Sequence, residues 1–298
     1  MEWPTLGLIA ACYTLWALAT TWLAALWLPA AVALTALAIA FHASLSHEAI
    51  HGHPTRRGWL NAALVFPALG LVVPYGRFRD SHLAHHRDAV LTDPYDDPES
   101  AYLEPAVWER LARPLRWLLT VNNTLLGRLI LGPAISLPVW LAGDARAMLA
   151  GDRRVIAAWA LHVPAVAVVA AWLAGPGAMP LPAYLVAAYL ALSLLKLRTY
   201  LEHRAHEHSA ARSVVVEDRG PLALLFLNNN LHIVHHMHPD VPWYRLPALY
   251  GANRARYLAR NRGYRYRSYA EVIARYLWRR KEPVAHPHYR GRRGGGQA

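Results

Sequence analysis

The chain has 298 residues, of which 55% are apolar and only 17% are charged, and its formal net charge is +12. Soluble proteins carry about 25% charged residues, so this composition indicates long apolar segments. Cys12 is the single cysteine, which excludes a disulfide framework and any cysteine-based zinc or iron–sulfur site.

Two long segments, residues 3–46 and 155–195, contain no Asp, Glu, Lys or Arg. Each is about twice as long as the roughly 20 residues that span a bilayer as a helix. A turn signal interrupts each of them, Leu28-Pro29 in the first and Gly175-Pro176-Gly177 in the second. We therefore expect two membrane-spanning helical hairpins. Their four helices are expected over residues 5–27, 30–50, 155–174 and 181–201.

Two shorter apolar runs, residues 59–75 and 125–141, are interrupted by prolines and glycines. We expect interfacial or re-entrant segments there, and therefore four spans in all. The hairpin turns carry no charge, whereas arginine is frequent elsewhere, and the positive-inside rule places the arginine-rich segments and both termini in the cytoplasm. We expect a bacterial inner membrane. The arginine-rich segments are residues 56–116, 146–154 and 245–293.

The expected fold is an all-α integral membrane protein with two hairpins, interfacial helices and a cytoplasmic histidine-rich helical cap. Residues 1–285 are expected to form one domain and residues 286–298 a disordered basic tail. The first apolar run lacks a basic start and a small-residue cleavage site, so we expect it to be retained. We expect the basic charge to attract anionic lipid, not nucleic acid.

Three histidine clusters with matched spacing lie just beyond the apolar segments. One is an H-x3-H pair and two are H-x2-H-H triplets, and residues three and four apart share one face of a helix. Eight imidazoles are too many for one metal ion and suit two. The expected topology places all three clusters on the cytoplasmic side, as a single site requires. The clusters are His47 and His51, then His82, His85 and His86, then His232, His235 and His236.

Other interpretations of single clusters remain open. His47, Glu48 and His51 also match the H-E-x-x-H motif of zinc proteases, in which Glu48 would be the general base. That interpretation assigns no role to the other two clusters. The second cluster alone could be a solvated polar helix, but its repetition in the third argues against coincidence.

Several neighbouring residues are further candidates. His203 and His206 emerge at the same face as the clusters, and either could supply a ninth ligand. Polar side chains can orient metal-bound imidazoles through the outer ring nitrogen. The aspartates could equally be surface charges, and the asparagines a turn or a helix cap. The candidates for the orienting role are Glu48, Asp80, Asp88, Asn228 and Asn229.

Together the boxes resemble those of the membrane fatty acid desaturase superfamily, over residues 35–260. The loop of residues 91–98 and the stretch of residues 238–247 are similar to bacterial desaturase-like proteins. The segment Thr199-Tyr200-Leu201-Glu202-His203 is similar to a Thr-Tyr-Leu-x-His stretch of carotenoid ketolases. This similarity favours His203 over His206 as a ligand.

The resemblance implies a non-haem di-iron site, held by the eight box histidines and His203, that uses O₂ to remove hydrogen from an unactivated C–H bond. Imidazole suits iron, whereas zinc has no redox chemistry. The implied substrate is a lipid or fatty acyl chain, with desaturation as the leading reaction and hydroxylation or ketolation of a lipid or carotenoid as the alternative. The sequence shows no cytochrome b5 domain, ferredoxin cysteines or nucleotide fingerprint, so we expect a separate electron donor of the ferredoxin or cytochrome type.

Overall fold

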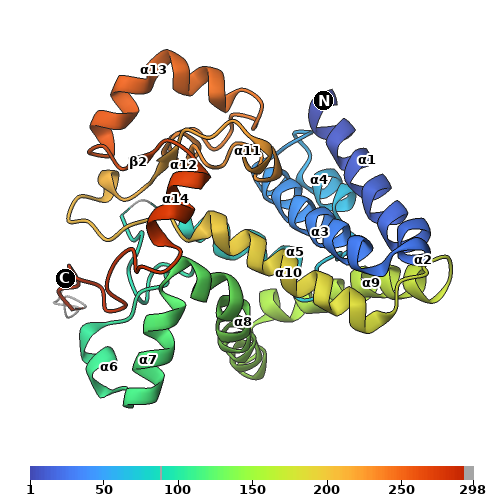
Figure 1. Ribbon diagram of the computed structural model, residues 1–298, viewed down its shortest axis with the longest axis horizontal. Coiled ribbons are helices and arrows are strands. Elements are labelled where there is room, and N and C mark those ends of the chain that lie inside the picture. The colour runs from blue at the N-terminus through green and yellow to red at the C-terminus, as the bar shows by residue number, and fades with distance from the viewer. Residues whose placement is uncertain (88, 292–298) are drawn as a thin grey trace.

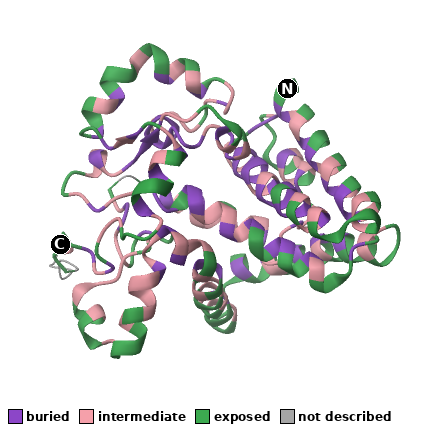
Figure 2. Ribbon diagram, viewed as in Figure 1, coloured by how far each residue is buried: buried purple, intermediate pink, exposed green. Residues whose placement is uncertain are grey.

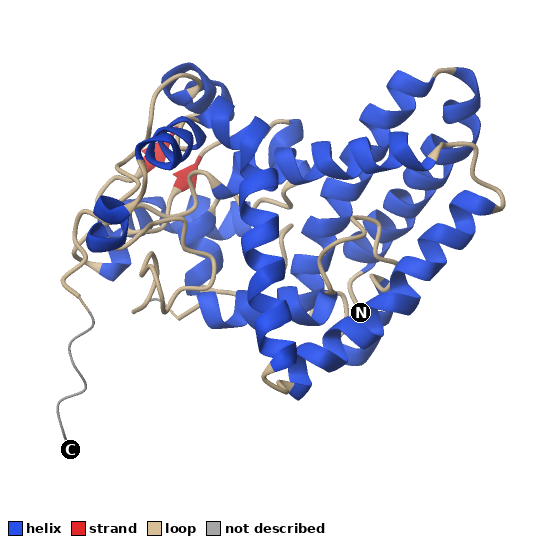
Figure 3. Cartoon of the chain, turned by 90° about the horizontal axis from the view of Figure 1, so that it is seen from below, coloured by secondary structure: helices blue, strands red, loops and turns tan. Residues whose placement is uncertain are grey.

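The computed structural model describes residues 1–87 and 89–291, and the regular secondary structure of the described chain is almost entirely helical (Figure 1). Its one sheet is a parallel pair of two-residue strands (Figure 3). The elements are α1 (Trp3–Leu18), the π-helix η1 (Ala19–Leu23), α2 (Ala24–Leu26), α3 (Leu28–Ile50), α4 (Gly58–Leu64), α5 (Tyr75–His85), α6 (Pro105–Arg110), α7 (Arg113–Asn122), α8 (Leu125–Leu149), α9 (Arg153–Ala174), α10 (Leu181–Thr199), the 3-10 helix η2 (Ser209–Ala211), β1 (Val215–Val216), α11 (Pro221–Leu225), α12 (His232–Met237), α13 (Leu246–Arg260), β2 (Arg265–Tyr266) and α14 (Tyr269–Tyr276).

The two expected hairpins are present. Residues Trp3–Leu26 form one continuous helical stretch that packs against α3, and α9 turns back into α10. Fully buried alanines lie along α3 and α10, where small side chains let two helices approach closely. The outer faces of these helices carry exposed residues, among them Trp22, Leu161 and Val186 (Figure 2). This surface suits contact with lipid.

Five helices, not four, are long and apolar enough to cross a membrane in the described chain, because α8 joins the four hairpin helices. The expectation of a short interrupted segment over residues 125–141 was wrong, since α8 is one helix of 25 residues that continues through Pro133 and Pro138. A proline removes one helical hydrogen bond, but packing against α10 keeps this helix continuous. In Figure 1, α8 is seen close to end-on, whereas α3, α9 and α10 lie across the view.

Both ends of α8 are bonded to segments that carry or adjoin the proposed metal ligands or follow α14. At its start, Leu126 donates its N–H to Leu277, and the hydroxyl of Tyr200, three residues before His203, donates to the carbonyl of Asn123. At its end, Asp144 accepts a bidentate hydrogen bond from Arg77 of α5, with contacts of 2.8–3.0 Å. Hydrogen bonds therefore anchor both ends of α8 to other parts of the chain.

Residues 65–74 form an irregular segment that enters the bundle after the short helix α4. Leu69 is fully buried. The backbone groups of this segment are bonded to the surrounding helices: Ala68 donates to the carbonyl of Ala165, and Tyr184 donates to the carbonyl of Leu69. Non-helical backbone inside a membrane bundle requires such partners. The segment leads into α5 at Tyr75.

The cap is built from α5 and from the chain after α10, and its interior is buried (Figure 2). A late segment, residues 280–289, crosses the cap, and we call it the strap. Lys281 donates to the carbonyl of His203, Leu103 donates its N–H to the carbonyl of Val284, and the His286 ring contacts the Thr92 hydroxyl at 3.1 Å. Residues 292–298 of the expected tail lie outside the described residues.

Candidate metal centre

Helix ends position all the expected metal ligands. His47 lies in the last turn of α3 and His51 caps it, while His82 and His85 end α5 and His86 caps that helix. His203 follows the end of α10. The third cluster, His232, His235 and His236, supplies half of the residues of the short helix α12.

The structure brings the nine histidines into two groups. Within each group the possible ligand atoms all lie within 4.8 Å of one another. Each triplet contributes to both groups, because its middle histidine joins one group and its two outer histidines join the other. The first group is His47, His51, His82, His86 and His235, and the second is His85, His203, His232 and His236.

Nitrogen–nitrogen distances in both groups are short. In the first group the Nε2 of His82 lies 3.0 Å from the Nε2 of His51 and of His86. In the second group the Nε2 of His203 lies 2.8 Å from that of His85 and 3.0 Å from that of His232. Two nitrogens bound to one ion at about 2.1 Å lie about 3.0 Å apart when the angle at the ion is 90°. The spacing therefore fits neighbouring ligands of one ion.

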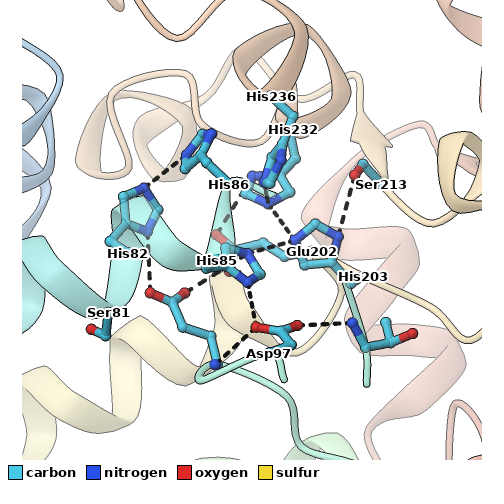
Figure 4. Close-up of polar contacts among 12 residues, drawn as sticks. Ser81, His82, His85, His86, Asp97, Glu202, His203, Ser213, His232 and His236 are labelled. Carbon is cyan, nitrogen blue, oxygen red and sulfur yellow. Dashed lines mark hydrogen bonds and ion pairs between the residues drawn. The ribbon is translucent and has the colours of Figure 1, made fainter. Parts of the chain in front are cut away.

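Oxygen atoms occupy the outer side of several rings (Figure 4). The Nδ1 of His85 lies 2.7 Å from the buried carboxylate of Asp97, and that of His232 lies 3.0 Å from the amide oxygen of Asn229. The Nδ1 of His203 lies 3.2 Å from the hydroxyl of Ser213. In the first group, the Nδ1 of His82 lies 3.1 Å from the carboxylate of Glu99. An acceptor at Nδ1 places the ring proton there and leaves the Nε2 lone pair directed into the group.

Converging lone pairs at these distances repel one another unless a cation lies between them. Burial lowers the pKa of His203 and His232 well below the usual histidine range, as does the positive charge of neighbouring rings. Burial also lowers the pKa of His85, but Glu99 and Asp97 more than offset it and raise that pKa to about 9. Without a metal ion, a proton on His85 can lie between the rings; a bound metal would replace that proton.

Two buried ring nitrogens in the first group have no hydrogen-bond partner among the described residues, the Nδ1 of His86 and the Nε2 of His47. His47 is almost completely buried. A buried polar atom without a partner is costly, and a metal ion in the first group would satisfy the Nε2 of His47. The donor set thus fits two ions.

Only some of the residues expected to orient the ligands contact a ligand ring. Asn229 contacts His232, as described above. Asp80 instead pairs with its neighbour Arg79, and the side chain of Asn228 donates to the carbonyl of Trp243. Glu48 is buried beside His47, and its carboxylate accepts the N–H of Trp243 at 3.3 Å. Asp88 lies outside the described residues, and His206 is not in either group.

Two carboxylates at the site were missed by the sequence analysis. Asp97 and Glu99 lie in the loop after the second cluster, and both contact histidine rings. The resemblance had marked residues 91–98 as a family-like loop, so its buried acid could have been proposed. Glu202, which follows the end of α10, forms a 2.8 Å ion pair with Arg198 and lies 3.8 Å from the Nδ1 of His232.

The histidine groups, their carboxylate partners and the helical bundle agree with the comparison to known families. The family model described as fatty acid desaturase matches residues 6–269. The chain belongs to the fatty acid desaturase family. The resemblance found in the sequence is therefore confirmed.

Individual relatives are distant. Beta-carotene ketolases from two Paracoccus strains are each 30% identical over 213 residues, which cover 68% of this chain and 71% of the ketolase. The sphingolipid delta(4)-desaturase/C4-monooxygenase of Bos taurus is 28% identical over 215 residues, which cover 71% of this chain and 59% of that protein. Both the family and these relatives are oxidoreductases, which supports an enzymatic role for this chain.

Proposed function

We propose that this protein is a membrane-bound, non-haem di-iron oxidoreductase that uses O₂ to oxidise a C–H bond of a lipid, with desaturation of a fatty acyl chain as the leading reaction. The observation that carries the proposal is the convergence of nine imidazoles into two groups whose nitrogens have ligand spacing. Family membership supports the same chemistry.

The first group would hold one iron with five imidazoles and the second group would hold the other with four. Such an iron pair, when bound, supplies the redox chemistry that splits O₂ and abstracts hydrogen from an unactivated carbon. The protein's own side chains fix the ring orientations, through Asp97, Glu99 and Asn229. Most ligand rings are buried, which keeps bulk water from the reacting atoms.

The histidine groups are proposed to face the cytoplasm of a bacterial cell, with four spans and α8 lying along the membrane surface. The contacts at the two ends of α8 support this arrangement, because they bond both ends to segments that the proposed topology places in the cytoplasm. Its exposed apolar side chains, including Ile130 and Val139, then lie in the interfacial layer.

The electrons are proposed to come from a separate donor of the ferredoxin or cytochrome type. Helix α13 packs on α12, which carries three of the ligands, and Tyr257 of α13 lies with its ring 6.1 Å from that of His238. Exposed arginines follow on and after α13, among them Arg256, Arg262 and Arg267. A basic surface above the metal centre suits an acidic donor.

Hydroxylation or ketolation is the second candidate reaction, and the names of the relatives favour it. Two relatives are ketolases and a third is named as both a desaturase and a monooxygenase. Desaturation and oxygenation share the first hydrogen abstraction, so the same histidine groups suit both.

A zinc protease centred on His47, Glu48 and His51 is less well supported. A catalytic zinc site needs three protein ligands and an activated water, whereas these histidines lie in a group of five. The Glu48 carboxylate is also engaged with the backbone of Trp243.

Lipid profiling of a host that expresses the protein with a reductase system tests the function, with the His235→Ala variant as the control. A new unsaturated acyl product, absent in the variant, supports desaturation, and an oxygenated product supports the second candidate. Metal analysis of the purified protein should find two irons per chain. A single zinc with peptide cleavage that needs no O₂ would overturn the proposal.

A further inference from the structure

A cavity of about 480 Å³ opens between α11 and the first turn of α13. This volume lies within the range of about 300–1,000 Å³ that is usual for small-molecule sites. Most of its wall is apolar, with one charged side chain. Its lining includes Arg219, Ala223, Leu224, Asn228, Trp243 and Ala248.

The cavity lies where the cap meets the membrane bundle. Helix α11 packs against α3, and Leu225 at its end contacts the core of the bundle. The ring of Trp243 packs near the start of the chain, where its Nε1 donates to the hydroxyl of Thr5 at 3.3 Å. Leu224, on the cavity wall, is half exposed. A lipid can therefore reach the cavity from the membrane boundary.

Two lining residues are each linked to a proposed metal ligand through one intervening residue. Asn228 precedes Asn229, whose amide oxygen contacts the ring of His232. The N–H of Trp243 donates to the carboxylate of Glu48, which is adjacent to His47. One wall of the cavity is thus formed by residues that are linked to the histidine groups through Asn229 and Glu48.

Arg219 gives the cavity a positive charge. It is exposed and is the only charged residue among the lining residues. Its acidic neighbours are engaged elsewhere: Asp218 accepts the N–H groups of Gly220 and Tyr269, and Glu217 pairs with Arg254 at 2.6 Å. The guanidinium is therefore available to an anion, and guanidinium groups bind phosphate and carboxylate through paired hydrogen bonds.

We infer that this cavity binds the head of the substrate lipid, and that this head is anionic, with its phosphate or carboxylate paired with Arg219. The inference rests on the proposed function, and it narrows the substrate to a lipid with a charged head. The apolar wall at Leu224 and Trp243 contacts the first part of the chain. The rest of the chain extends past Asn228 towards the histidine groups.

Equilibrium binding to the purified protein in neutral detergent tests the inference without requiring turnover. The probes are a fluorescent phosphatidylglycerol and a fluorescent diacylglycerol with the same acyl chains. Arg219→Gln should weaken binding of the phosphatidylglycerol about tenfold, as expected for the loss of one charge-assisted contact, and leave diacylglycerol binding unchanged. Ala248→Phe, which fills the cavity from an exposed position, should weaken binding of both.

Arg153→Gln is the matched control, because Arg153 is an exposed arginine at the start of α9 and does not line the cavity. Unchanged phosphatidylglycerol binding in Arg219→Gln, or an equal loss in Arg153→Gln, would overturn the inference. In turnover assays, Arg219→Gln should raise KM for an anionic lipid with little change in kcat. Binding that depends on Arg219 in a protein without O₂-dependent turnover would refute the proposed function and leave the binding site standing.

Discussion

The carboxylate of Asp97 allows a sharp test of the second histidine group. It is buried, with one oxygen 2.7 Å from the Nδ1 of His85 and 2.9 Å from the N–H of Glu99, and the other 2.8 Å from the N–H of Thr92. Asp97→Asn preserves the shape but replaces one acceptor oxygen with an N–H₂ group. Whichever way the amide turns, it presents a donor to one of these N–H groups.

The expected cost follows from these contacts. A hydrogen bond to a charged group contributes about 1.5–3 kcal/mol, and loss of a partner that orients a metal-bound histidine lowers metal affinity about 10–100-fold, or about 1.4–2.8 kcal/mol. Because Asp97 contacts only the group that contains His85, we expect the iron bound by this group to be lost first. The first group should keep its iron.

Chelator titration followed by measurement of iron per chain provides the assay. The wild-type protein should retain two irons at chelator concentrations where Asp97→Asn retains one. Asp96→Asn, at the exposed neighbouring position, is the matched control and should behave as the wild type. Two irons held in Asp97→Asn with unchanged chelator resistance would refute the role of Asp97, and equal loss from both groups would refute the division of the ligands.

Three further predictions concern other parts of the molecule. Glu48→Gln should keep O₂-dependent turnover well above that of His51→Ala, with a loss of at most about 10–100-fold. The reason is that a glutamine oxygen can still accept the N–H of Trp243. Complete loss of activity with metal retained would support a role for Glu48 as a general base instead. Reporter fusions near residues 28 and 176 should be external and fusions at residues 123 and 151 cytoplasmic, and an external signal at residue 151 would mean that α8 crosses the membrane. Hydrogen bonds from Arg254 and other neighbours lower the pKa of Glu217 to about 2, so its stabilising contribution is present above the usual carboxylate pKa of about 4.3 and is lost as the pH falls towards 2. Glu217→Gln should therefore lower stability by about 1–2 kcal/mol at pH 7 and by progressively less on acidification, in thermal unfolding of the detergent-solubilised protein; a deficit that does not change with pH would contradict the assignment.

The membrane hairpins could be predicted from the sequence because the bilayer imposes a length and excludes charge. The helix Leu28–Ile50 lies within two residues of its expected start and at its expected end. The helix at residues 125–149 was more difficult to predict. Its two prolines predict an interruption from the local sequence, and only the packing of α8 against α10 keeps the helix continuous.

The eight histidines of the three clusters could be selected from spacing, and His203 from its similarity to a family stretch, but their division into two groups could not be predicted. His82 and His86 lie one turn apart and join the first group, while His85 between them joins the second. That division depends on how α3, α5 and α12 meet, which no local pattern contains. The same is true of Asp97, whose role depends on the folding of a loop back onto the helix before it.

The strap determines when during synthesis the metal centre can be completed. Translation proceeds from the N-terminus, so the first hairpin and the second histidine cluster emerge long before residues 280–289. Lys281 contacts the backbone of His203, and His286 contacts the loop that carries Asp97. Until these late residues leave the ribosome, both contacts are missing. Full support of the ligands therefore comes later in synthesis than the ligands themselves, and a chain interrupted before residue 280 would carry every histidine of the site without the contacts that hold His203 and the Asp97 loop in place.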